Sequence, residues 1–253
     1  MRTYVMLRPM GLALLLAAAV PAAAAAPDVE SIVRRIDELY RADNSYAKME
    51  MRIVNPNWER TMTMQVWTQG MDKTLIRILS PAKDRGIATL RVDDEMWNYY
   101  PKIDKVMKVP PSMMMSSWMG SDFTNDDLVK ESTLLEDYDV KRLEPEDAEK
   151  GFHYIEFTPK EQTPSVWARI VAKVETDPLL PVRQDYYDES DELVRTITFS
   201  ERKTLGGRYL PAVMSVDPIN KPKNRTVIRY LEAEFNQGVP DGTFSLRALR
   251  QAP

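Results

Sequence analysis

Apolar and polar residues alternate along most of the chain, and this period-2 pattern predicts a protein built mainly of β-strands. Residues 46–54, for example, place Met49, Met51 and Ile53 on one side of a strand. Further strands are predicted at residues 61–68, 73–79, 87–92, 96–100, 105–109, 152–158, 166–174, 181–188, 193–200, 209–216 and 225–235. Short strands and turns at this spacing are typical of an antiparallel meander, here of about eleven to thirteen strands.

Helical spacing occurs in few places. Residues 28–42 have Ile32, Val33 and Ile36 on one face and charged residues such as Arg35 on the other, which predicts an amphipathic helix that covers the sheet. A short helix is predicted over residues 124–131, with Asp122 or Thr124 as its N-cap. Asp122 is the preferred cap, and no catalytic role is expected for it. Residues 135–150 are acidic and mixed, and they are interpreted as a surface loop or as one strand plus a turn.

The N-terminus has the pattern of a secretory signal peptide over residues 1–25. Arg2 and Arg8 precede the apolar residues 11–20, and a run of alanine follows. The apolar stretch is too short to span a membrane, and a lipid-attachment cysteine is absent because the chain has no cysteine. We therefore expect a soluble, exported, periplasmic protein in which residues 26–253 form a single domain and no segment spans the membrane after cleavage.

Composition excludes several classes of function. The formal net charge is −4, and it becomes −6 without the two leader arginines, which argues against binding of nucleic acid. One histidine, His153, and no cysteine rule out the usual zinc sites, and nine glycines leave no glycine-rich phosphate loop. The acidic pairs at residues 93–94, 126–127 and 136–137 fit solvated turns better than a hydrolase or a calcium site. No catalytic residue, metal or cofactor is therefore predicted.

Methionine is concentrated in one segment. Six of the fifteen methionines lie between Met96 and Met119, and residues 113–115 are consecutive methionines that neither a helix nor a strand can bury on one face. Methionine is flexible and polarizable, so such a surface can repack around ligands of different shape. Residues 112–119 are therefore predicted to form a mobile flap over an apolar cavity; the rival interpretation is a packed core plug.

The same alternation of apolar and polar residues predicts which side chains line that cavity and its flap. The predicted ligand-binding residues are Met49, Met51, Met62, Met64, Ile76, Ile78, Leu90, Trp97, Tyr99, Met113, Met114, Met115, Trp118, Met119 and Phe123. A register error of one residue would move a strand's whole set to the other face.

Two short motifs carry a resemblance to a known family. They are MWNYYP at residues 96–101 and MGSDF at residues 119–123, supported by SPAKDRG at residues 80–86 and YLP at residues 209–211. In this order and spacing, they make the chain similar to the LolA-like outer-membrane lipoprotein-sorting proteins, in the branch of stand-alone periplasmic members. The likeness covers roughly residues 28–250, although the methionine-rich segment departs from the family pattern.

The resemblance implies an unclosed β-barrel of about eleven antiparallel strands with a lid of short helices. It also implies an apolar cavity that holds acyl chains, a donor transporter in the inner membrane and an acceptor at the outer membrane. The sequence therefore predicts a mainly β (α+β) carrier or chaperone for a lipoprotein or lipid, and not an enzyme. The alternatives are an envelope sensor that binds lipidated or misfolded proteins and a carboxylate-dependent hydrolase.

Overall fold

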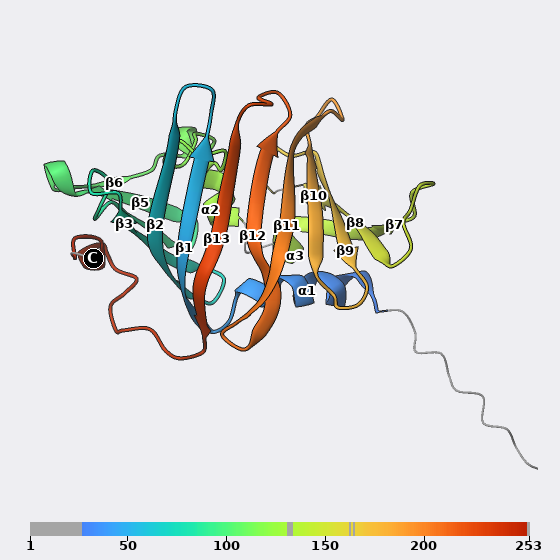
Figure 1. Ribbon diagram of the computed structural model, residues 1–253, viewed down its shortest axis with the longest axis horizontal. Helices are drawn as coiled ribbons and strands as arrows, with labels where there is room; N and C mark the ends of the chain where they lie inside the picture. The colour runs from blue at the N-terminus through green and yellow to red at the C-terminus, as the bar shows by residue number, and fades with distance from the viewer. Residues whose placement is uncertain (1–26, 131–133, 162, 164, 252–253) are drawn as a thin grey trace, which may run out of the picture.

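The computed structural model describes residues 27–130, 134–161, 163 and 165–251 of the 253-residue chain. The predicted signal peptide, residues 1–25, lies outside the described residues. Within them, thirteen strands form one sheet in the order β6-β5-β4-β3-β2-β1-β13-β12-β11-β10-β9-β8-β7 (Figure 1). Every neighbouring pair is antiparallel, and the sheet is curved but not closed, which confirms the predicted fold class.

Most strands pair with their neighbours in sequence because short turns connect them, as expected for a meander. The first half of the sheet contains β1 (Asn44–Val54), β2 (Glu59–Gln69), β3 (Lys73–Ser80), β4 (Ala88–Val92), β5 (Glu95–Tyr100) and β6 (Lys105–Lys108). The second half contains β7 (Tyr138–Leu143), β8 (Phe152–Pro159), β9 (Arg169–Glu175), β10 (Pro181–Tyr187), β11 (Leu193–Leu205), β12 (Arg208–Pro218) and β13 (Arg225–Phe235). Pairing of β1 with β13 joins the two halves, and the edges are β6 and β7.

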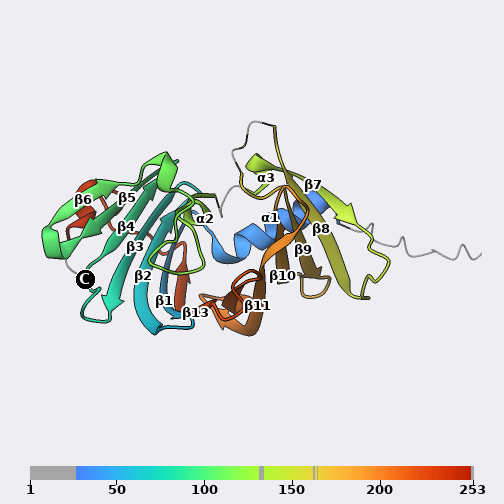
Figure 2. The same ribbon diagram turned by 90° about the horizontal axis from the view of Figure 1, so that it is seen from above.

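The helix α1 (Val29–Tyr40) lies between the two halves of the sheet (Figure 2). Its N-cap is Asp28, whose carboxylate accepts a hydrogen bond of 2.9 Å from the backbone N–H of Ser31. Ile32 and Val33 are buried against the apolar residues of β7, β8 and β9, as the amphipathic pattern predicted. The helix therefore covers the second half of the sheet.

The chain between β6 and β7 forms a lid that contains the 3₁₀ turn η2 (Pro111–Met113), α2 (Asn125–Lys130) and α3 (Leu134–Asp137). Of the two predicted N-caps of α2, the preferred Asp122 is wrong and Thr124 is confirmed. The backbone N–H of Asp127 donates to Thr124 Oγ1 at 3.1 Å, and the backbone N–H of Thr124 donates to Asp127 Oδ2. This reciprocal pair is a capping box. Asp122 instead accepts from the hydroxyl of Thr226 at 2.7 Å, and so ties the lid to β13.

The first half of the sheet buries side chains on both faces. We call the face toward α1 and the lid the inner face; it contains an apolar cluster made up of Met51, Ile53, Met62, Met64, Val66, Ile76, Ile78, Met96 and the lid residue Trp118. The short helix α4 (Leu246–Leu249) covers the outer face, where Ala248 and Leu249 pack on β3, β4 and β5. Because α4 covers the outer face, β3 and β4 are covered on both faces, and nearly all of their residues are buried.

Candidate ligand-binding cavity

An apolar cavity of about 200 Å³ lies between the inner face of the sheet, α1 and the lid. Its wall contains side chains from both halves of the sheet. The curvature of the sheet turns these two halves toward each other (Figure 2). The apolar residues that line it include Ile36, Met49, Met64, Val66, Ile76, Trp118, Phe123, Leu128, Trp167, Ile170, Ile197, Phe199, Met214 and Ile228.

Five of the predicted ligand-binding residues lie at this cavity. They are Met49, Met64, Ile76, Trp118 and Phe123. Met49 and Met64 are cross-strand partners, so the register of β1 and β2 places both side chains on the inner face. Trp118 and Phe123 belong to the lid, and each is only 4% exposed.

Other predicted residues lie beside the cavity and do not line it. Met51, Met62 and Ile78 are buried in the inner-face cluster, and Met119 packs against that cluster. Met113 and Met115 are 50% and 42% exposed, and Met114 is half-buried. Exposed methionines are compatible with the predicted flap and not with a packed plug, whereas the buried Trp118 next to them is part of the core. Mobility of the flap stays a prediction.

Three predicted cavity residues lie on the wrong face. Leu90, Trp97 and Tyr99 point to the outer face, where they pack with Leu75 under α4. The strands β4 and β5 were assigned one residue out of register, because outer-face residues are also apolar here and alternation alone cannot tell the two faces apart. Met96 is the residue of β5 that belongs to the inner-face cluster.

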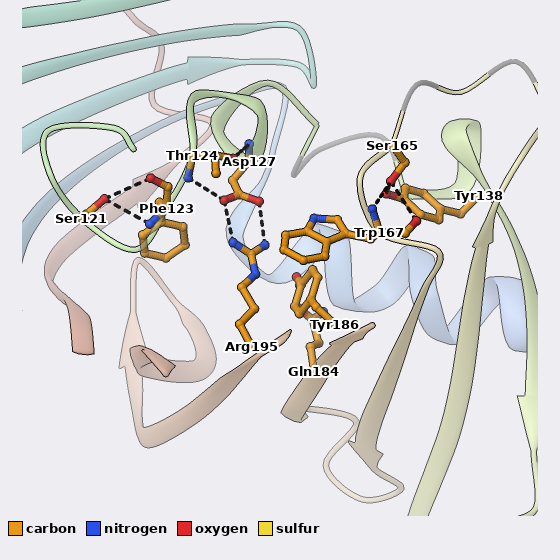
Figure 3. A network of polar contacts seen from close by, with 10 residues as sticks. All are labelled: Ser121, Phe123, Thr124, Asp127, Tyr138, Ser165, Trp167, Gln184, Tyr186 and Arg195. Carbon is orange, nitrogen blue, oxygen red and sulfur yellow. Dashed lines mark hydrogen bonds and ion pairs between the residues drawn. The ribbon is translucent and has the colours of Figure 1, made fainter. Parts of the chain in front are cut away.

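A buried ion pair joins the lid to the second half of the sheet at the cavity wall (Figure 3). Arg195 on β11 donates from Nη1 and Nη2 to the two carboxylate oxygens of Asp127 on α2, at 2.7 and 2.6 Å. Arg195 is only 4% exposed, so this bidentate pair is largely removed from water. We call the two residues the clasp.

Two aromatic rings lie beside the guanidinium of the clasp (Figure 3). The guanidinium carbon of Arg195 lies 4.5 Å from the ring centroid of Trp167 and 4.2 Å from that of Tyr186. The rings themselves are packed edge to face, with centroids 5.2 Å apart. Burial lowers the pKa of Arg195, but the charge and hydrogen bonds of Asp127 outweigh this effect and raise the pKa above its usual value. The guanidinium is therefore permanently charged.

Sequence reasoning did not identify the clasp. The sequence pattern predicts a solvated acidic turn at Asp127 and predicts no partner for it. One signal was present in the sequence. Arg195 alternates with the apolar residues Ile197 and Phe199, and so lies on the same face of the strand as they do. A charged residue on the apolar face of a strand indicates a buried charge that has a partner of opposite sign.

The single histidine lies away from the cavity and is not among its lining residues. His153 on β8 contacts the guanidinium of Arg142 on β7, with 2.9 Å between His153 Nδ1 and Arg142 Nη1. Burial and the charge of Arg142 lower the pKa of His153. The described part of the chain contains no cluster of three or more histidine, cysteine or acidic residues suited to a metal ion. It also contains no helix long and apolar enough to cross a membrane.

Comparisons with known proteins place the chain among LolA-like structures. A protein-family model described as "Uncharacterized protein" matches residues 70–251, whereas no curated protein matches the chain in sequence. A DUF1329 family protein from Desulfovibrio piger is 27% identical, with a TM-score of 0.78 over 87% of this chain and 96% of that one. A putative outer membrane lipoprotein-sorting protein domain from Vibrio parahaemolyticus is 22% identical, with a TM-score of 0.74 over 87% and 97%. A LolA superfamily protein from Nitrosomonas europaea is 20% identical, with a TM-score of 0.72 over 87% and 98%.

Proposed function

The chain belongs to the family whose model matches residues 70–251, and the fold of the chain is LolA-like. We propose that the protein is a periplasmic carrier of acyl chains. In this proposal, a lipid or the lipid anchor of a lipoprotein leaves an inner-membrane donor, travels in the cavity and reaches an outer-membrane acceptor. The observation that supports the proposal most strongly is an apolar cavity between a curved sheet and a lid, built by both halves of the sheet.

The energetics suit reversible carriage without covalent chemistry. Each buried CH₂ group gains about 0.8 kcal/mol, so a chain of ten such groups gains on the order of 8 kcal/mol before ordering costs. The cavity of about 200 Å³ is smaller than the roughly 300–1,000 Å³ of typical ligand pockets. A long acyl chain therefore requires the lid to move outward, and the exposed methionines of residues 113–115 provide apolar surface for the enlarged cavity.

A cavity-filling substitution tests this proposal. Ala47 on β1 is 5% exposed and lines the cavity, so Ala47→Phe should fill part of the space. We expect the mature protein to bind a fluorescent fatty acid such as cis-parinaric acid, and Ala47→Phe to weaken that binding at least tenfold. The matched control is Ala148→Phe at an exposed loop position, which should bind as the wild type does. Equal probe affinity in a folded Ala47→Phe variant would contradict the proposal.

A further inference from the structure

One end of the apolar cavity is polar. On the inner face, Ser45 of β1 pairs with Thr68 of β2, Thr68 with Thr74 of β3, and Thr74 with Arg91 of β4. All four side chains are buried, although the same face of these strands is otherwise mainly apolar. Ser45, Thr68 and Thr74 also line the cavity. We call this row, together with Arg41 at the end of α1, the polar pole.

Arg41 stands at the junction of two cavities. It lines the apolar cavity and also a neighbouring cavity of about 610 Å³ near the C-terminal end of α1. Its Nη1 atom is buried and has no hydrogen-bond partner within the described part of the chain. The hydroxyl of Thr74 is buried and without a partner in the same way. Two hydrogen-bonding groups at one end of a cavity are thus left for a ligand, since leaving such groups unpaired is costly.

Two guanidiniums lie near each other at the polar pole. The pKa of Arg91 is lowered first by burial and then by the positive charge of Arg41, while Asp72, Asp94 and Asp93 act in the opposite direction. The guanidiniums of Arg41 and Arg91 are therefore close enough to repel each other. Asp37, which lines both cavities, and the three aspartates near Arg91 contribute negative charge that partly offsets the two guanidiniums. An oxyanion would relieve the repulsion and accept hydrogen bonds from Arg41 and Thr74.

We propose that the polar pole binds the oxyanion of an amphiphile, a carboxylate or a phosphate, whose acyl chain occupies the apolar cavity. This inference rests on the proposed function and specifies its ligand class: an anionic lipid is preferred over a neutral one with the same chain. Polar groups at one end of an apolar pocket fix the orientation of a ligand. Here they direct the headgroup toward Arg41 and the neighbouring cavity, and the chain toward Met64 and Ile76.

The test compares three ligands that share one oleoyl chain: oleate, oleoyl lysophosphatidic acid and methyl oleate. Their affinities for the mature protein are measured by tryptophan fluorescence, below the concentration at which micelles form. We expect at least one anionic ligand to bind about tenfold or more tightly than methyl oleate, and the tighter of the two identifies the headgroup as carboxylate or phosphate.

Variants at Arg41 connect that preference to the polar pole. Arg41→Gln should lose about tenfold in affinity for the anionic ligand and little for methyl oleate, and Arg41→Lys should restore part of the preference. Arg34→Gln is the matched control, because it removes the same charge from the exposed face of the same helix. Melting temperatures show that each variant is folded.

Two results would overturn the proposal. One is equal binding of oleate, the lysophospholipid and methyl oleate by the wild type. The other is an equal loss of all three ligands in a folded Arg41→Gln variant. If the wild type binds none of the three, the proposed carrier function fails as well, so the two failures can be told apart.

Discussion

The clasp gives a sharp quantitative prediction about stability. Asp127→Asn keeps the shape of the side chain but removes its charge, and this leaves the guanidinium of Arg195, 4% exposed, without its carboxylate. Removing one partner of a buried ion pair costs about 3–5 kcal/mol. The rings of Trp167 and Tyr186 stay in contact with the guanidinium, and the new amide oxygen can accept one hydrogen bond. We therefore expect a loss near the lower limit, about 3 kcal/mol.

The assay is thermal unfolding of the mature protein followed by circular dichroism. For a domain of this size, 1 kcal/mol shifts the melting temperature by roughly 2–4 °C, so Asp127→Asn should lower it by roughly 6–12 °C. Glu59→Gln is a matched control. Glu59 accepts two hydrogen bonds from Arg52, at 2.7 and 2.9 Å, in the same bidentate manner, but both side chains are about half exposed.

An exposed pair contributes only about 0–1 kcal/mol, so Glu59→Gln should shift the melting temperature by no more than roughly 4 °C. Replacing both members of the clasp by apolar residues, Asp127→Leu with Arg195→Met, should recover much of the stability, because no charge is then left buried. If Asp127→Asn costs no more than Glu59→Gln, the clasp does not stabilise the protein as a buried ion pair.

Three further predictions concern the lid and the histidine. Replacing Met113, Met114 and Met115 together with Ser should weaken binding of an acyl ligand but lower the melting temperature by no more than a few degrees, because two of the three are exposed; a steep loss of stability would end the flap hypothesis. Trp118→Ala should cost about 3–5 kcal/mol in denaturant unfolding, because its ring is buried in the inner-face cluster; a cost below about 1 kcal/mol would show that Trp118 is not part of the core. The folded-state pKa of His153 is lowered from 6.5, so stability should fall as pH decreases through that value. His153→Gln should flatten this dependence of stability between about pH 7 and 5. An unchanged dependence of stability on pH in that variant would refute the role given to His153.

The fold could be predicted from sequence because alternation and turns are local signals. The spacing of strands predicted a meander, and the motifs at residues 96–101 and 119–123 predicted its LolA-like form. The preference for Asp122 over Thr124 as the N-cap of α2 was wrong because both are good capping residues, and only the tertiary contact of Asp122 with Thr226 separates them.

The candidate site could be predicted only in part. Alternation placed Met49 and Met64 at the cavity, but it misplaced Leu90 because the outer face of the same strands is buried under α4. The sequence gives no sign that a helix covers this face, since α4 is only four residues long and lies far from these strands in the sequence. The clasp depends on a contact between residues 127 and 195, which are 68 positions apart and were invisible to local patterns.

Native mass spectrometry of the intact protein isolated from the periplasm tests the central claim most directly. If the cavity carries acyl chains, the wild type should retain an acylated ligand at about one molecule per chain. The Ala47→Phe variant, in which the cavity is partly filled, should be recovered largely free of it. Wild-type protein that carries no acylated molecule, or an Ala47→Phe variant that carries as much as the wild type, would contradict the account.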